Sequence, residues 1–271
     1  MRLSQFLDTN ADIVRVSLCR VRGSSPREAG AEMFVTPDGL HGTIGGGQLE
    51  YMAIDQARKM LGSGRDFDRM DVPLGPEIGQ CCGGRVELAL QRMTQADRAQ
   101  ALAADAERQA ARPHVYVLGA GHIGRALARF FQFLPVRCIL IDSRPEELEL
   151  VDAKVETRLT PMAEAEIRAA PPGSAFIVLT HDHALDFLLT SEALDRRDAA
   201  YVGLIGSATK RMKFARFHQS HAAQSDCTRL ICPIGDTSSP DKRPEVIAAS
   251  VTAQVMSVLT TAQSEDVKLT I

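Results

Sequence analysis

Two adjacent cysteines, Cys81 and Cys82, lie in the glycine-rich stretch "PLGPEIGQCCGG" over residues 73–84. A thiolate is a nucleophile and a strong ligand for soft metals, and the flanking glycines leave the sulfur accessible. Because neighbouring side chains tend to diverge, we expect one of the two thiols to be functional. The alternative is a pair of small buried residues at the start of a strand, since a free cysteine packs like a small apolar residue.

A second glycine-rich loop, "HGTIGGGQLEYM" over residues 41–52, leads into a predicted helix. Its three consecutive glycines, Gly45, Gly46 and Gly47, leave backbone N–H groups unshielded, an arrangement suited to an anion at a helix N-terminus. A tight turn that needs positive φ is the alternative, and such a turn would use one or two glycines rather than three. The count of glycines therefore favours an anion site.

A third glycine motif, in "VYVLGAGHIGRAL", fits the dinucleotide-binding fingerprint of a strand, a G-x-G-x-x-G turn and a helix. Its glycines are Gly119, Gly121 and Gly124. Asp142 ends the next apolar run, near the spacing for a carboxylate that binds ribose hydroxyls. Asp142 disfavours a 2′-phosphate, whereas Ser143 and Arg144 leave NADP open. The motif predicts a Rossmann-like fold, and its crevice holds NAD(P), another nucleotide or nothing.

Polar residues follow two further strands of this region. His181 and His183 are candidates for ligands or acid–base groups, but Asp182 between them favours a helix start that this aspartate caps. Lys210 and Arg211, after the next strand, either reach an anion or are solvated. Neither a Ser–His–Asp, nor an HExxH, nor a Walker pattern occurs in the sequence, so no local hydrolase motif accounts for a function.

The elements that position these motifs change in character along the chain. Residues 1–93 predict a smaller α+β domain of short strands and one helix, and the Ala-rich stretch 94–112 predicts a linker helix. Residues 113–271 alternate apolar strands with helices and end in a helix that begins at Pro244. Nearly continuous apolar strands spaced by helices predict a doubly wound parallel sheet. The predicted fold class is therefore α/β.

Composition excludes some classes of function. The 271 residues carry a formal charge of −3 and 5% aromatic residues, which argues against nucleic acid as a partner. The sequence shows neither an apolar signal core at its start nor a run long enough to span a membrane, so we expect a cytoplasmic protein. In that compartment the six cysteines are expected to be thiols. The absence of a Cys-x-x-Cys pair argues against structural zinc.

Taken together, these motifs resemble the XdhC/CoxI family, accessory proteins of molybdenum hydroxylases, and the xanthine dehydrogenase branch in particular. The resemblance covers nearly the whole chain and follows the family's order of motifs. The segments that carry it are "RGSSPREAGAEM", "GTIGGGQLE", "PLGPEIGQCCGG", "VLGAGHIG", "IDSRPEEL", "THDHALD", "YVGLIGS" and "CPIG". In the carbon monoxide dehydrogenase branch a cysteine often follows the first glycine pair, where this chain has Gln48.

The resemblance implies a chaperone that binds the molybdenum cofactor as cargo and shields it, rather than a catalyst with turnover. It implies a cysteine desulfurase that sulfurates the cofactor, and the apo subunit of xanthine dehydrogenase as recipient. The "GQCCGG" loop with Gln80, Cys81 and Cys82 would hold the metal or dithiolene end, and the triple-glycine loop the phosphate or an oxo group. A homodimer is also expected.

Two alternatives stay open at this point. One is an NAD(P)-dependent oxidoreductase, suggested by the third glycine motif and Asp142, with His181 or His183 as proton donor. The other is a thiol-based sulfur carrier centred on Cys81 and Cys82, which requires a persulfide or a vicinal disulfide during function.

Overall fold

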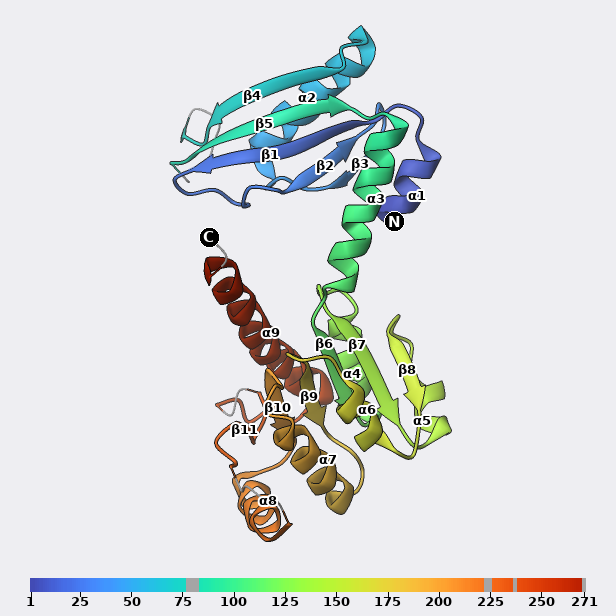
Figure 1. Ribbon diagram of the computed structural model, residues 1–271, viewed down its shortest axis with the longest axis vertical. Helices are drawn as coiled ribbons and strands as arrows, with labels where there is room; N and C mark the ends of the chain where they lie inside the picture. Colours follow the sequence, from blue (N-terminus) through green and yellow to red (C-terminus); the bar gives the residue numbers. More distant parts are fainter. Residues whose placement is uncertain (77–82, 222–225, 236–237, 270–271) are drawn as a thin grey trace. The chain divides into compact units, whose positions relative to one another are not determined.

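The computed structural model describes residues 1–76, 83–221, 226–235 and 238–269, and the chain divides into two compact units (Figure 1). The first unit comprises Met1–Ala110 and the second Ala111–Ile271. The first contains an antiparallel sheet with helices and the second a parallel sheet covered by helices. The predicted α/β class, with a Rossmann-like sheet and a smaller α+β domain, is therefore confirmed.

The first unit is built on a five-stranded sheet with the order β3-β2-β1-β5-β4, and neighbouring strands are antiparallel. Its elements are α1 (Leu3–Thr9), β1 (Val14–Arg22), β2 (Glu32–Val35), β3 (Leu40–Gly42), α2 (Gly47–Ser63), β4 (Phe67–Pro73), β5 (Arg85–Arg92) and α3 (Gln95–Ala110).

Side chains that alternate along the strands separate two small cores in this unit. Val14, Val16 and Leu18 of β1 pack with the apolar stripe of α2, which contains Leu49 and Ala53. The opposite face carries residues of α1 and α3 around Phe34. A period of two in the strands and a helical stripe in α2 thus place α2 on one face and α1 with α3 on the other.

The second unit contains a six-stranded parallel sheet with the order β11-β10-β9-β6-β7-β8. Its elements are β6 (His114–Leu118), α4 (His122–Phe131), β7 (Arg137–Asp142), α5 (Pro145–Glu149), β8 (Glu156–Leu159), α6 (Ala163–Ala169), β9 (Ala175–Val178), α7 (His183–Asp195), β10 (Tyr201–Leu204), α8 (Ala208–His221), β11 (Leu230–Ile231) and α9 (Pro244–Leu269). This is the doubly wound order in which ligands bind at the carboxyl ends of the strands, where the winding reverses between β6 and β9.

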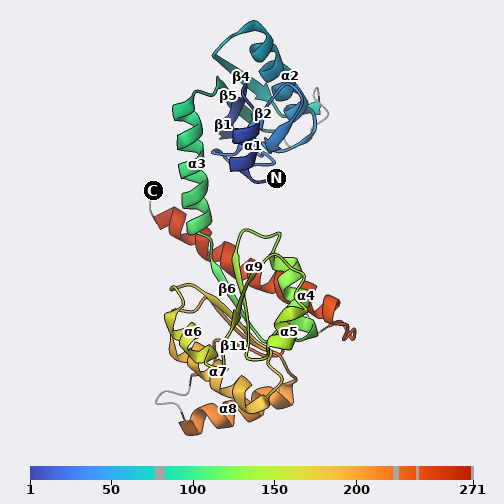
Figure 2. The ribbon, with the colours of Figure 1, turned by 90° about the vertical axis from the view of Figure 1, so that its right-hand side faces the viewer.

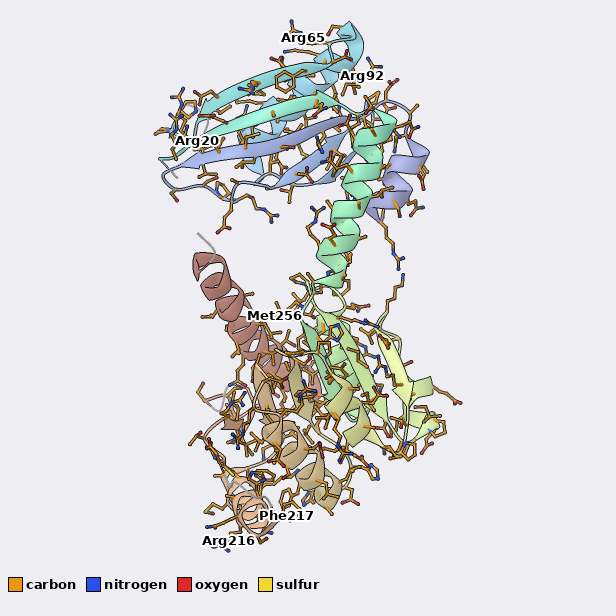
Figure 3. All side chains as sticks on the ribbon, viewed as in Figure 1. Arg20, Arg65, Arg92, Arg216, Phe217 and Met256 are labelled. Atoms are coloured by element: carbon orange, nitrogen blue, oxygen red, sulfur yellow. The ribbon has the colours of Figure 1, made fainter. Side chains whose placement is uncertain are left out.

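Helices cover both faces of this sheet (Figure 2). On one face α4 and α9 pack together, with Phe131, Val251 and Val255 in a shared core. Met256 of α9 packs against the same core (Figure 3). Helices α6, α7 and α8 bury Ile167, Leu189 and Phe214 on the opposite face. Strands β6, β9 and β10 are buried almost throughout, which explains their nearly continuous apolar sequences.

Two elements differ from the sequence prediction. The first 93 residues contain α1 as well as α2, where one helix was expected. Strand β8 was not expected, and its residues alternate between exposed and half-buried because it forms an edge of the sheet. Within the described part of the chain, no helix combines the length and apolar character needed to cross a membrane.

Candidate functional site

Loops from three parts of the sequence meet at one end of the first unit's sheet. Ser24 forms an isolated bridge with Gly83, the residue that follows Cys82. The Gly83 amide donates to the Leu74 carbonyl at 2.9 Å, and the Leu74 amide donates to the Gly84 carbonyl at 2.8 Å. These contacts fasten the chain on both sides of residues 77–82. Arg20 of β1 lies toward this end of the sheet, whereas Arg65 and Arg92 lie toward the other (Figure 3).

Backbone contacts at this point are too close for side chains. A Cβ on Gly84 would lie 2.0 Å from the Ser24 carbonyl oxygen and 2.9 Å from that of Arg22. A Cβ on Gly23 would lie 3.2 Å from the Gly84 Cα. Glycine is therefore required at residue 84, because the chain of residues 22–24 passes directly against it.

The triple-glycine loop reaches the same place. A Cβ on Gly45 would lie 3.1 Å from the Pro26 Cβ and 3.6 Å from the Arg27 Cγ. We call residues 23–27, 43–47 and 83–84 the three-loop cluster. The structure thus brings together the described residues of three motifs that the sequence singled out separately.

All three glycines of residues 45–47 have positive φ, at 134°, 79° and 65°. A turn with this backbone uses every one of them, so the expectation that a turn needs only one or two glycines is wrong. The number of glycines no longer argues for an anion by itself.

An internal carboxylate already occupies part of this loop. Glu50, in the first turn of α2, accepts a hydrogen bond from the Ile44 amide at 3.0 Å and another from the Thr43 hydroxyl. Burial alone would raise the pKa of Glu50, but the hydrogen bonds from Thr43 and from loop amides outweigh it and hold this pKa below its ordinary value. An anionic ligand at this loop would therefore meet a negative charge nearby.

Arg27 provides a positive charge in the three-loop cluster. Its stem lies beside Gly45, and it forms no ion pair within 4 Å with any residue that the structure describes. An arginine beside backbone N–H groups is suited to a phosphate or an oxo anion. It could offset the charge of Glu50.

Gln80, Cys81 and Cys82 lie outside the described residues, so their predicted roles stay predictions. Four other cysteines are free thiols: Cys19, Cys138, Cys227 and Cys232. Burial raises the pKa of Cys138 to about 12, which makes that thiol unreactive. Among the residues described, no group of three or more His, Cys, Asp or Glu side chains is arranged to hold a metal ion.

The third glycine motif has the geometry of a dinucleotide-binding turn. A Cβ on Gly119 would lie 2.4 Å from the Leu179 carbonyl oxygen, and one on Gly124 would lie 1.9 Å from that of Gly119. A Cβ on Gly121 would meet nothing within 4 Å. The outer two glycines therefore permit close packing, and the middle one leaves open space at the N-terminus of α4.

Asp142 ends β7 beside this turn, but its carboxylate binds other parts of the protein. Oδ2 accepts from the Ala120 amide at 2.7 Å, and the Arg144 guanidinium donates to both oxygens. Burial would raise the pKa of Asp142, but the hydrogen bonds from Arg144 and from Ala120 lower it overall. The carboxylate is ionised and only 7% of the residue is exposed.

A small cavity of about 20 Å³ lies at the carboxyl ends of β6, β7 and β9, with room for about one water molecule. Apolar residues such as Leu118 and Leu185 line it together with Ser143, Thr180 and His181. Gly119 and Asp142 also border it. The structure therefore brings two predicted site residues and His181 to one place, although an aromatic ring could enter only after side chains move.

The remaining polar candidates have structural partners. Asp182 accepts hydrogen bonds from the Ala184 and Leu185 amides, so the expected helix cap is confirmed. Lys210 forms an ion pair of 2.5 Å with the fully buried Asp186, rather than facing an anion or solvent. Arg211 donates to the Cys232 carbonyl at 3.2 Å.

Asp186 was not identified from the sequence. Its Oδ1 accepts from both the amide and the hydroxyl of Thr180 at 2.8 Å, while Lys210 binds Oδ2. These contacts join the loop after β9 to the first turns of α7 and α8. An aspartate inside an apolar helix, with a lysine 24 positions later, is the only trace of the pair in the sequence.

Comparisons with known sequences identify both units. A family model described as "XdhC Rossmann domain" matches residues 115–255, just over half of the chain. A second model, described as "XdhC and CoxI family", matches residues 6–71. The matches include the triple-glycine loop and the dinucleotide-binding turn.

Two proteins of Escherichia coli K12 are similar to the chain. YqeB, an uncharacterised protein, is 26% identical over 263 residues, which cover 93% of this chain and 44% of YqeB. The chain thus spans less than half the length of that relative. PaoD, a molybdenum cofactor insertion chaperone, is 27% identical over 269 residues, which cover 90% of this chain and 83% of PaoD.

The fold is similar to that of a solved structure. A crystal structure described as a xanthine dehydrogenase from Bacillus halodurans matches with a TM-score of 0.80 and 17% sequence identity. The match covers 96% of this chain and 95% of that chain. At this identity the likeness concerns the fold alone.

Proposed function

Because this chain belongs to the XdhC and CoxI family, we propose that it binds the molybdenum cofactor as cargo and supports its insertion into an apo molybdenum hydroxylase of the xanthine dehydrogenase type. The similarity to PaoD, a molybdenum cofactor insertion chaperone, supports the nature of the cargo. We propose a binding and transfer role without catalytic turnover.

The three-loop cluster is the observation that carries this proposal. It places Gly83, next to Cys82, against Ser24, and it places Gly45 against Pro26. In this proposal Cys81 or Cys82 contacts the molybdenum or the dithiolene, because a thiolate is a soft ligand that suits such a centre. Gln80 belongs to the same loop and would line the site.

The other two loops would hold the anionic end of the cargo. Gly46 immediately precedes α2 and has open space where a Cβ would be, beside the loop amides that Glu50 already engages. The phosphate or an oxo group would lie there, with Arg27 balancing the negative charge of Glu50. Glu50 would keep the loop in its turn conformation by accepting from the Ile44 amide.

The partners follow from this role. We propose that a cysteine desulfurase sulfurates the bound cofactor and that an apo subunit of xanthine dehydrogenase receives it. A cytoplasmic homodimer remains part of the proposal.

Transfer to the recipient tests the function. Apo xanthine dehydrogenase is incubated in air with free cofactor, or with cofactor preloaded on this protein, and the activity recovered is measured. The proposal predicts higher recovery with the preloaded protein, and loss of that advantage for Cys81→Ser, Cys82→Ser or both. Cys19→Ser is the matched control, because Cys19 is an exposed thiol of the same unit outside the cluster. Equal recovery with and without the protein would contradict the proposal.

An NAD(P)-dependent oxidoreductase is the second candidate. The open space at Gly121 favours it, since that is where a diphosphate approaches the backbone in dinucleotide-binding folds, whereas the contacts of Arg144 with Asp142 count against it. In that candidate, His181 at the nearby cavity would act as proton donor. Tight nicotinamide binding with no uptake of molybdenum cofactor would favour this second function.

A further inference from the structure

The carboxylate of Asp142 is enclosed by four hydrogen-bond donors of its own unit. Oδ1 accepts from the Arg144 amide at 3.0 Å and from Arg144 Nε at 3.0 Å. Oδ2 accepts from the Ala120 amide at 2.7 Å and from Arg144 Nη2 at 2.9 Å. An ionised carboxylate has about four acceptor positions, so Asp142 has none left for a ligand.

The position of Asp142 in the fold shows which ligand contact Arg144 blocks. Asp142 is the last residue of β7, next to the turn that contains Gly121. In dinucleotide-binding folds an acidic residue at this place accepts the hydroxyls of the adenosine ribose. Here the Arg144 guanidinium lies against both oxygens, where those hydroxyls would have to bind.

Arg144 is itself held in place by neighbouring charges. Its Nη1 donates to Glu147 at 3.4 Å, and Glu147 also forms an ion pair with Arg125 of α4. The Arg125 guanidinium in turn donates to the Ala120 carbonyl at 2.7 Å. A ribose diol would therefore have to break a bidentate ion pair and disturb a wider network to reach Asp142.

We propose that Arg144 is a specificity-determining residue of this crevice, which closes Asp142 to ligands that are recognised through vicinal ribose hydroxyls. The space at Gly121 remains open to a phosphate group. The crevice thus discriminates against NAD-type adenosine ligands while it can accept a phosphorylated compound that needs no diol contact.

Removal of the Arg144 side chain should uncover Asp142 without unfolding the unit. The side chain of Arg144 is 27% exposed, so its loss leaves no closed cavity. The amide of residue 144 and the Ala120 amide still donate to the carboxylate. Arg144→Met keeps most of the apolar stem, and Arg144→Ala removes it.

The test compares ADP with 2′-deoxy-ADP, which differ by one hydroxyl of the diol, in calorimetric titrations. The wild type should bind both with similar weak affinity. Arg144→Ala and Arg144→Met should prefer ADP by about 10-fold, the effect expected of a hydrogen bond to a charged group. Adding Asp142→Asn to Arg144→Met should remove most of that preference.

Arg129→Met is the matched control, because Arg129 of α4 pairs with the exposed Asp152 instead of with Asp142. The ratio of its affinities for ADP and 2′-deoxy-ADP should equal that of the wild type. A wild type that already prefers ADP by about 10-fold would overturn the proposal. Folded Arg144 variants that keep the wild-type ratio of these affinities would also overturn it. Folded Arg144 variants that do not bind ADP at all would overturn it too. The titrations contain no molybdenum cofactor, so their outcome is independent of the proposed function.

Discussion

The two glycine-rich loops that precede α2 and α4 use their glycines in different ways. At the start of α4, Gly119 and Gly124 lie so close to backbone oxygens that a Cβ would clash. Gly119 also has a positive φ of 127°, while φ of the intervening Gly121 is an ordinary −62°. In the loop before α2, by contrast, all three glycines have positive φ, and Gly46 has open space beside it. Close packing against backbone oxygens distinguishes the first loop, and three successive positive φ angles distinguish the second.

Each loop also gives a backbone amide to a carboxylate of the same unit. Asp142 accepts from Ala120, and Glu50 accepts from Ile44. The difference lies in the counter-charge, because Arg144 encloses Asp142 whereas no described arginine or lysine pairs with Glu50. A glycine-rich loop before a helix thus does not by itself show that a ligand supplies the anion, since the protein can supply its own.

Gly124→Ala should have the largest effect on stability. Its Cβ would lie 1.9 Å from a backbone oxygen that cannot move aside cheaply, so we expect a loss of about 3 kcal/mol or more in the free energy of unfolding. Gly121→Ala in the same loop should change it by less than about 0.5 kcal/mol, because its Cβ meets nothing. Urea denaturation measures both. Equal losses would show that packing does not distinguish these glycines.

Gly46→Ala tests the conformational loop. With φ 79° and ψ 179°, Gly46 occupies a region that is essentially reserved for glycine, and we expect alanine to cost about 1–3 kcal/mol there. Gly62→Ala, in the last turn of α2 with space around it, should instead stabilise by up to about 0.5 kcal/mol. Thermal melting of the two variants and the wild type measures these changes in stability. A neutral Gly46→Ala would mean that the loop tolerates another backbone.

Glu50→Gln tests whether the internal carboxylate holds the triple-glycine loop. The amide keeps the shape of the side chain but loses its charge, so the hydrogen bonds from Ile44 and Thr43 weaken. We expect a loss of about 1 kcal/mol in the free energy of unfolding. Glu149→Gln at the exposed end of α5 is a control that should be neutral. Identical stability of both variants would argue that Glu50 does not support the loop.

The smallest effect that we predict is the pH dependence of the free energy of unfolding that Glu50 causes. Its pKa is lowered in the folded protein, so its stabilising contribution is complete above the ordinary glutamate value of about 4.3 and is lost as pH falls through the lower folded value. The stability difference between wild type and Glu50→Gln should therefore narrow below about pH 4. Chemical denaturation over pH 3–7 checks this, and a difference that is constant with pH would contradict it.

Most of the second unit could be predicted from the sequence, because buried parallel strands are almost wholly apolar and the glycines of the turn have a fixed spacing. Strand β8 was missed for the opposite reason. At the sheet edge its sequence "ETRL" contains two charged residues, Glu156 and Arg158, which bind each other rather than a core. Helix α1 was missed because it is short and has no side-chain cap.

The site was predictable only as motifs. The sequence identifies Asp142 and the triple-glycine loop, but it does not reveal which donors reach their acceptors. Arg144 lies only two positions after Asp142, but the sequence does not show that its guanidinium reaches both carboxylate oxygens. Lys210 of α8 meets Asp186 of α7 because these helices follow the adjacent strands β10 and β9. The pairing of Lys210 with Asp186 depends on tertiary structure, as does the meeting of Ser24 with Gly83.

Equilibrium binding of the molybdenum cofactor tests the central claim most directly. The purified protein is titrated anaerobically with the cofactor, for wild type, Cys81→Ser, Cys82→Ser, Arg27→Met and Gly121→Ala. The account predicts stoichiometric binding to the wild type and to Gly121→Ala, with affinity lost in at least one cysteine variant and reduced in Arg27→Met. Unchanged affinity in both cysteine variants and in Arg27→Met, or affinity lost only in Gly121→Ala, would contradict a cofactor site in the three-loop cluster.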